Sequence, residues 1–200
     1  MPKSSSTDTI AGVVLAAGAS RRMGTNKLLL ELDGESLIRR AVSRANEAGL
    51  APVIVVLGHD VERVSAELTE LECEIVVNPD PSRPMSASMH LALAALPPKV
   101  SAAVVVLPDM IHVTTAMLRD IGRAARAGEQ PLVVSRYGSV TAPPILYRRA
   151  LFAELLEWNG EGCGKPIVQR HMNEALVKDW PESALADVDT PADFAAVKRS

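Results

Sequence analysis

A loop of small and basic residues follows the first apolar run of the chain. It reads Leu15-Ala16-Ala17-Gly18-Ala19-Ser20-Arg21-Arg22-Met23-Gly24, and Lys27 follows closely. Small side chains let a ligand approach the backbone, and consecutive N–H groups can bind phosphate oxygens. Arg21 and Arg22 add planar cationic forks, and Lys27 adds a compact point charge. We therefore expect an anion site, with a solvated basic turn as the alternative.

The glycine spacing excludes two common phosphate-binding motifs. Gly18 and Gly24 stand too far apart for G-x-G-x-x-G, and Lys27 does not directly follow a glycine as in G-x-x-x-x-G-K-[ST]. The loop is therefore neither a dinucleotide fingerprint nor a Walker A loop.

Acidic residues occur at two further positions where chemistry is expected. Asp109 directly follows an apolar run, and a carboxylate at a strand end can hold Mg²⁺ together with substrate phosphates. Asp187 and Asp189 point the same way if their segment is extended. The structural alternative is that Asp109 caps a turn and that Asp187 or Asp189 caps the last helix, a role that Thr190 also fits.

Composition limits the function classes. The chain has 21 basic and 24 acidic residues, a formal net charge of −3, and only 3% aromatic residues. Without a basic excess or stacking rings, nucleic acid is not expected as a partner. The apolar runs are strand-length, too short for a membrane span, and two cysteines do not make a disulfide framework. We expect a cytoplasmic protein with a disordered tail over residues 1–9 and a single domain over residues 10–200.

Short β-branched runs alternate with patterns of helical period. The expected strands, buried on both faces, are Ile10–Ala16, Pro52–Leu57, Cys73–Val77, Ala102–Leu107 and Pro131–Ser135. The expected helices are Leu37–Ala48 ending at Gly49, Val61–Leu71 capped by Asp60, Ser86–Leu96, Thr115–Ala127, and a last helix capped at Thr190. Ile145–Tyr147, which follows two prolines, suits an edge strand or a strand-entry turn.

This alternation predicts an α/β fold with a mostly parallel sheet and helices on both faces. In such sheets, ligands bind beyond the carboxyl ends of the strands. That rule selects the loops at residues 17–26, 58–60, 78–85 and 108–112, which include both the basic loop and Asp109.

The ordered set of motifs resembles the nucleotidyltransferases that act on the molybdenum cofactor, most closely the CTP:molybdopterin cytidylyltransferase-like group. After the Leu-Ala-Ala-Gly-x-Ser-x-Arg-Met-Gly signature come, in the family order, Gly58-His59-Asp60, Asn78-Pro79, Met85-Ser86-Ala87-Ser88, Leu107-Pro108-Asp109-Met110 and Asp187-Val188-Asp189-Thr190-Pro191. The resemblance spans Ile10 to about Lys198.

The resemblance implies a Rossmann-like, three-layer nucleotidyltransferase fold that binds an NTP and Mg²⁺. It places Leu15, Ala16, Ala17 and Gly18 at the nucleotide, with Arg21 and Ser86 as further contacts, and Arg22 and Lys27 at the triphosphate. It makes Asp109 a metal ligand, completed by Asp189. Related guanylyltransferases usually carry glycine at the position of Ala17, so alanine suggests CTP. Ser86 can instead serve only to cap its helix.

Two departures from the family bear on the acceptor. Pro84 replaces the usual glycine before Met85, and residues 141–144, Thr-Ala-Pro-Pro, stand where the cytidylyltransferases carry Gly-His-Pro. The second departure removes a histidine from the acceptor side. Lys165, in a Gly-rich loop on that side, either binds an acceptor phosphate or is a surface lysine at a helix start.

Three functions follow from these residues. The first is Mg²⁺-dependent transfer of CMP from CTP to molybdopterin or another phosphorylated small molecule, with a molybdoenzyme or its maturation factor as a further partner. The second keeps the nucleotide site and changes the acceptor to a sugar or polyol phosphate. The third is a nucleotide- or cofactor-binding chaperone with little turnover, which would not need paired metal carboxylates.

Overall fold

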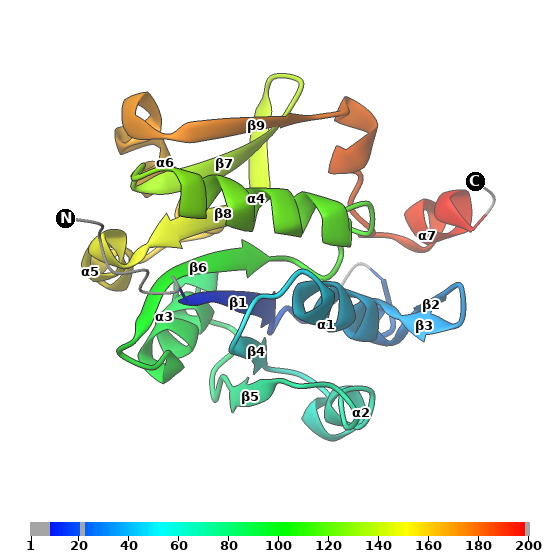
Figure 1. Ribbon diagram of the computed structural model, residues 1–200. Helices are drawn as coiled ribbons and strands as arrows, with labels where there is room; N and C mark the ends of the chain where they lie inside the picture. The colour runs from blue at the N-terminus through cyan, green and yellow to red at the C-terminus, as the bar shows by residue number, and fades with distance from the viewer. Residues whose placement is uncertain (1–8, 21–22, 199–200) are drawn as a thin grey trace.

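The computed structural model describes residues 9–20 and 23–198, and its centre is a seven-stranded sheet (Figure 1). The strands are β1 (Thr9–Ala16), β4 (Val53–Leu57), β5 (Glu74–Val77), β6 (Val100–Val106), β7 (Leu132–Tyr137), β8 (Val140–Arg148) and β9 (Leu176–Trp180), in the order β5-β4-β1-β6-β8-β7-β9. The neighbouring pairs are parallel except those of β8, which runs antiparallel to both β6 and β7. A small hairpin, β2 (Glu31–Leu32) with β3 (Glu35–Ser36), lies outside this sheet.

Helices cover both faces of the sheet. The helices that cover it are α1 (Leu37–Glu47), α2 (Val61–Ala66), α3 (Met85–Ala95), α4 (Thr115–Ala127), α5 (Phe152–Glu157) and α6 (Lys165–Arg170). A further helix, α7 (Pro191–Val197), lies beside the sheet, and short 3-10 turns occur at Lys27–Leu29, Arg149–Leu151, Met172–Glu174 and Glu182–Leu185. The apolar cores assign α1, α2 and α4 to one face and α3, α5 and α6 to the other. The expected mostly parallel sheet between two helical layers is confirmed. No helix among the described residues has the length and apolarity needed to span a membrane.

Alternation along the strands divides the core between the two faces. On β1, Val14 and Ala16 pack toward α1 and α4, whereas Val13 and Leu15 pack toward α3. Valine-rich strands bury both faces because each face is covered by helices. The scarcity of aromatic residues is therefore compensated by close packing of small side chains.

Local signals explain how the best-predicted helices begin and end. The Ser36 hydroxyl accepts from the Arg39 N–H and begins α1, and Gly49 follows its end with a left-handed φ of +78°. At α7, the Thr190 hydroxyl accepts from the Asp193 N–H, and the Asp193 carboxylate accepts from the Thr190 N–H. This capping box confirms Thr190 as the cap and leaves the Asp189 carboxylate available elsewhere.

Several predicted boundaries and placements were wrong. Ile145–Tyr147 belongs to the nine-residue β8, which lies inside the sheet because it pairs with β6 and β7. β5 was expected to be buried on both faces, but it is the edge strand, with Ile75 and Val77 exposed. Thr9, assigned to the tail, is the first residue of β1, and residues 1–8 lie outside the described part of the chain.

The helix after Asp60 is shorter than predicted and is capped differently. α2 ends at Ala66, and the chain continues in tight turns with hydrogen bonds from Leu68 to Ser65 and from Leu71 to Leu68. Asp60 adopts a left-handed φ of +55°, and its side chain makes no capping hydrogen bond. Its carboxylate accepts from Arg63 at 2.9 Å instead, so the expected side-chain cap was wrong.

Candidate nucleotidyl-transfer site

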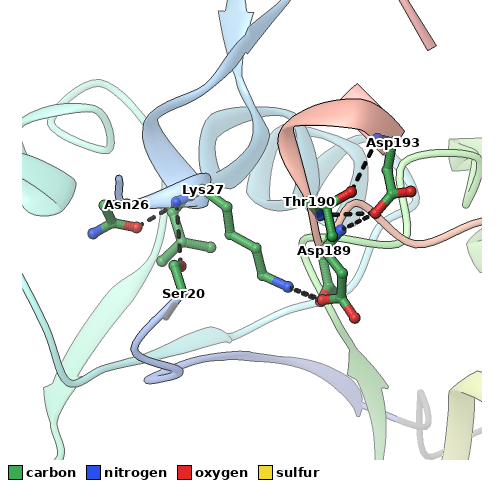
Figure 2. A network of polar contacts seen from close by, with 8 residues as sticks. Ser20, Asn26, Lys27, Asp189, Thr190 and Asp193 are labelled. Carbon is green, nitrogen blue, oxygen red and sulfur yellow. Dashed lines mark hydrogen bonds and ion pairs between the residues drawn. The ribbon is translucent and has the colours of Figure 1, made fainter. Parts of the chain in front are cut away.

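A lysine and two carboxylates from distant parts of the sequence meet at one edge of the sheet. The Lys27 Nζ atom donates to Asp109 Oδ2 at 2.6 Å and to Asp189 Oδ1 at 2.9 Å. Lys27 follows β1 and Asp109 follows β6, so both lie beyond the carboxyl ends of adjacent parallel strands. The strand order reverses between β1 and β6, because β4 lies on one side of β1 and β6 on the other. Ligands of open α/β sheets bind at such a reversal point. Figure 2 shows the Lys27 side chain extending toward Asp189.

The loop before Lys27 is held by its own polar groups. The Lys27 N–H donates to the Ser20 hydroxyl at 3.2 Å, and the Asn26 carboxamide accepts from the Leu28 N–H at 3.1 Å. Ser20 has a left-handed φ of +48°, and its carbonyl accepts from the Met23 N–H. Figure 2 shows Ser20 and Asn26 beside the backbone of Lys27, so these contacts fix where its side chain starts.

The ammonium and the two carboxylates are partly shielded from water. The Lys27 and Asp109 side chains are 15% and 19% exposed, and that of Asp189 is 35% exposed. Burial alone would lower the pKa of Lys27, but the charges and hydrogen bonds of Asp109 and Asp189 outweigh it and raise that pKa above its ordinary value. Lys27 is therefore fully protonated at neutral pH.

Asp187 adds a third carboxylate to the same neighbourhood. Partial desolvation, together with the negative charges of Asp109 and Asp189, raises the pKa of Asp187 to about 6, while Lys27 opposes the shift. The site therefore concentrates negative charge on the protein side, which favours a divalent cation.

The carboxylate pair fits Mg²⁺. Asp109 and Asp189 already converge on one cation, the Lys27 ammonium. No group of three or more His, Cys, Asp or Glu side chains among residues 9–20 and 23–198 is arranged to hold a metal. Mg²⁺ is usually held by one or two carboxylates plus water and phosphate oxygens, so two protein ligands beside an anion loop suit it.

A small apolar cluster lies beneath the polar site. Its buried members are Met23, Leu37, Ile111 and Val188, which come from the basic loop, α1, the Asp109 loop and the segment between Asp187 and Asp189. The Val188 N–H also donates to the carbonyl oxygen of Asp109 at 3.1 Å. The two carboxylate-bearing segments are thus joined by a backbone hydrogen bond as well as by packing.

Arg44 of α1 supports the Asp109 loop from below. Its Nη1 atom donates to the carbonyl oxygens of Ile111 at 2.8 Å and Val113 at 2.6 Å. Arg44 thus satisfies the hydrogen-bonding needs of two backbone carbonyl groups just after Asp109. The sequence analysis did not single out Arg44, whose only signal is a basic residue on an otherwise amphipathic helix.

A cleft of about 330 Å³ opens beside the first loop. Leu15, Ala17 and Gly18 line it together with Ser20, and its opposite wall carries residues of the 81–88 segment and Glu161. Ala16 faces the other way, into the core under α1. Three of the four residues expected at the nucleotide from the first loop therefore lie on one cleft, and Ala16 supports it from behind.

Ser86 lies away from this cleft. It is 2% exposed, and its hydroxyl accepts from the Gly160 N–H at 3.0 Å, while its own N–H donates to the Gly160 carbonyl at 3.2 Å. It neither lines the cleft nor caps α3, which has no side-chain cap. Ser88, two residues further along α3, lines the cleft instead. Arg21 and Arg22 lie outside the described residues.

A second, larger cleft of about 500 Å³ lies on the side of β8. It is lined mainly by apolar groups, including Ala142, Pro143 and Cys163, with Thr141 and Lys165 among the polar ones. Met85 lines both clefts and therefore separates them. The Thr-Ala-Pro-Pro segment and the Lys165 loop, which sequence reasoning placed together, do share this cleft.

Comparison with known proteins identifies the family. The model of the MobA-like NTP transferase domain matches residues 12–175. A probable molybdenum cofactor guanylyltransferase of Opitutus terrae is 35% identical over 130 residues, which cover 65% of this chain and 62% of that protein. Nicotine blue oxidoreductase of Paenarthrobacter nicotinovorans is 32% identical over 142 residues, which cover 70% of this chain and 67% of that protein.

A solved structure extends the similarity to the whole fold. The crystal structure of Rv0371c from Mycobacterium tuberculosis is 30% identical, with a TM-score of 0.85, and the match covers 96% of this chain and 98% of that one. Another structure of Rv0371c, 28% identical with a TM-score of 0.79, is a complex with manganese and covers 96% of this chain and 99% of that one. The chain is a member of the MobA-like NTP transferase family.

Proposed function

We propose that this protein transfers CMP from CTP to a phosphorylated small-molecule acceptor, with Mg²⁺ as cofactor and molybdopterin as the leading acceptor. The observation that carries the proposal is the convergence of Lys27, Asp109 and Asp189 beside two clefts. Ser20, which holds the Lys27 backbone, lines one cleft, and Leu107, next to the Asp109 loop, lines the other.

The reaction requires two anions to meet. An oxygen of the acceptor phosphate forms a bond to the α-phosphorus of the NTP, and the bond from that phosphorus to the bridging oxygen breaks, releasing pyrophosphate. A phosphate nucleophile is already ionised near neutral pH, so no general base is needed. Lys27 would bind the triphosphate as a point charge, and backbone N–H groups of the Ala17–Ser20 loop would position it. Arg21 and Arg22 are proposed to add charge there.

Asp109 and Asp189 would hold the Mg²⁺ ion. When bound, the ion neutralises charge on the transferring phosphates. The manganese complex of Rv0371c supports a divalent cation in this fold. With the nucleotide bound, the Lys27 ammonium gains phosphate oxygens as alternative partners, which frees the carboxylates for the cation.

Base preference is proposed to depend on Ala17. Ala17 lines the first cleft and is 9% exposed. A methyl group at this place reduces the room for a purine, which supports CTP, even though one relative carries the name of a guanylyltransferase.

The substitution Ala17→Gly tests this preference. We expect the ratio of CTP to GTP affinity to fall about ten-fold, because one methyl group in a pocket discriminates by roughly 1–3 kcal/mol. Calorimetric titration with both nucleotides measures the ratio, and Ala127→Gly, at the exposed end of α4, is the matched control. An unchanged ratio in Ala17→Gly would refute the assignment.

The acceptor is proposed to bind in the second cleft. Its apolar lining suits a heterocyclic ligand, and Lys165 offers a cation for a phosphate. The Thr141–Pro143 wall, which lacks the family histidine, favours a sugar or polyol phosphate as the second candidate. If molybdopterin is the acceptor, a molybdoenzyme or its maturation factor would receive the product.

Pyrophosphate release decides between these functions. The purified protein is mixed with Mg²⁺ and each of the four NTPs, with and without molybdopterin. We expect release with CTP only when molybdopterin is present. CTP binding without any molybdopterin-dependent release would exclude that acceptor and favour a sugar phosphate or a chaperone role, and a panel of phosphorylated sugars and polyols would separate those two.

A further inference from the structure

The wall of the first cleft that faces Ala17 carries a hydrogen-bond donor and an acceptor from different elements. Ser88 comes from α3 and Glu161 from the loop between α5 and α6, and both line the cleft that also holds Ala17. The family resemblance placed the Gly-rich loop of Lys165, which also contains Glu161, on the acceptor side. The structure divides that loop, with Glu161 at the nucleotide cleft and Cys163 and Lys165 at the other.

The Ser88 hydroxyl is oriented as a donor. Ser88 is 4% exposed, and its oxygen accepts a hydrogen bond from the Asn78 Nδ2 atom at 3.0 Å. Among the described residues the structure gives the hydroxyl proton no acceptor. Because Ser88 lines the cleft, that proton is available to a bound ligand.

The Glu161 carboxylate is oriented as an acceptor. Its Oε2 atom accepts from the Met85 N–H, at the start of α3, at 3.4 Å. The preceding residue, Gly160, is fixed to Ser86 by two hydrogen bonds, one in each direction. These bonds give Ser86 a role in holding the Glu161 loop against α3. A carboxylate has further lone pairs, so one oxygen can accept from a ligand in the cleft.

A base with an exocyclic amino group matches this pair. Cytosine presents an amino donor beside ring acceptors, and acidic side chains are known partners of its amino group. Uracil presents a carbonyl oxygen in place of the amino group, which a carboxylate repels. We propose that Glu161 selects amino-bearing bases, with Ser88 donating to the adjacent ring acceptor, and so determines specificity against UTP. This inference rests on the proposed nucleotide site.

The substitution Glu161→Gln tests the assignment. A glutamine can turn its amide to donate to uracil, so the variant loses discrimination without losing volume. We expect the ratio of CTP to UTP affinity, measured by calorimetry, to fall about ten-fold, since hydrogen bonds to charged groups contribute roughly 1.5–3 kcal/mol. Glu157→Gln, at the exposed end of α5, is the matched control and should leave the ratio unchanged.

A second variant separates the positioning of the Glu161 loop by Ser86 from the direct contact of Glu161 with the base. Ser86→Ala removes the hydroxyl that accepts from the Gly160 N–H, so it loosens the Glu161 loop but keeps the carboxylate itself. We expect the preference for CTP over UTP to fall less in Ser86→Ala than in Glu161→Gln.

The same test applies if the wild-type protein prefers GTP. The comparison is then between GTP and ITP, which lacks the amino group, and we expect the same loss of preference in Glu161→Gln.

The outcomes distinguish this inference from the proposed function. Wild-type protein that binds CTP more tightly than UTP, with the same ratio in Glu161→Gln, overturns the role of Glu161 and leaves the transferase proposal standing. Wild-type protein that binds no NTP overturns both. A ratio that falls in Glu161→Gln but not in Glu157→Gln supports both.

Discussion

Replacing Asp109 with asparagine will lower the rate of pyrophosphate release by on the order of a thousand-fold, while the protein stays folded. Asparagine keeps an oxygen that can accept from Lys27, so the contact at 2.6 Å has a substitute. What is lost is the negative charge, which the metal role requires. A residue that only capped a turn would tolerate the change with little loss of turnover.

A binding measurement and a control variant accompany the rate measurement. Binding of Mn²⁺ in the presence of CTP, followed by electron paramagnetic resonance, should weaken in Asp109→Asn. Asp179→Asn is the control, because Asp179 lies on the edge strand β9, is 65% exposed and pairs with Arg136 of β7, away from the site. Activity near the wild-type level in Asp109→Asn would remove Asp109 from the metal site.

Replacing Lys27 with alanine will weaken NTP binding about ten- to hundred-fold, in line with the contribution of roughly 1.5–3 kcal/mol from a charged hydrogen bond. The loss arises because the triphosphate no longer meets the ammonium. Lys178→Ala is the matched control, since it removes a lysine that pairs with Asp120 at 2.8 Å on another part of the sheet. Calorimetric titration without metal measures the nucleotide alone.

The Lys27→Ala variant also tests whether Asp109 and Asp189 bind a metal ion. Without Lys27, Asp109 and Asp189 lose their shared cation, so we expect Mn²⁺ alone to bind at least as tightly as in the wild type. Weaker NTP binding with undiminished Mn²⁺ binding separates a phosphate contact from general damage to the site. Unchanged NTP affinity would show that Lys27 serves only as an ion-pair partner.

The central part of the fold was predictable because its signals are local. β1, β4 and β6 are largely apolar runs of strand length, and α4 was predicted with its observed bounds, Thr115–Ala127. β9 was missed because Leu176–Trp180 carries charged residues, which suit an edge strand that is only half buried. The position of β8 inside the sheet depends on pairing with strands far apart in sequence, which no local pattern records.

The site was predictable to the extent that strand ends define it. Lys27 and Asp109 follow adjacent strands, so the general rule for parallel sheets brings them together without any family knowledge. The choice of Asp189 came from the family resemblance. The location of Glu161 was not predictable, because it depends on how the loop between α5 and α6 packs against α3.

The ion pair between Lys27 and Asp189 joins residues 162 positions apart. Most of the chain must therefore be synthesised before the second carboxylate can reach the lysine, although the strands that carry the sheet end at Trp180. A nascent chain can thus complete its sheet before it completes the carboxylate pair. We therefore expect the contact between Lys27 and Asp189 to form late in folding, when the segment containing Val188 packs against Met23 and Ile111.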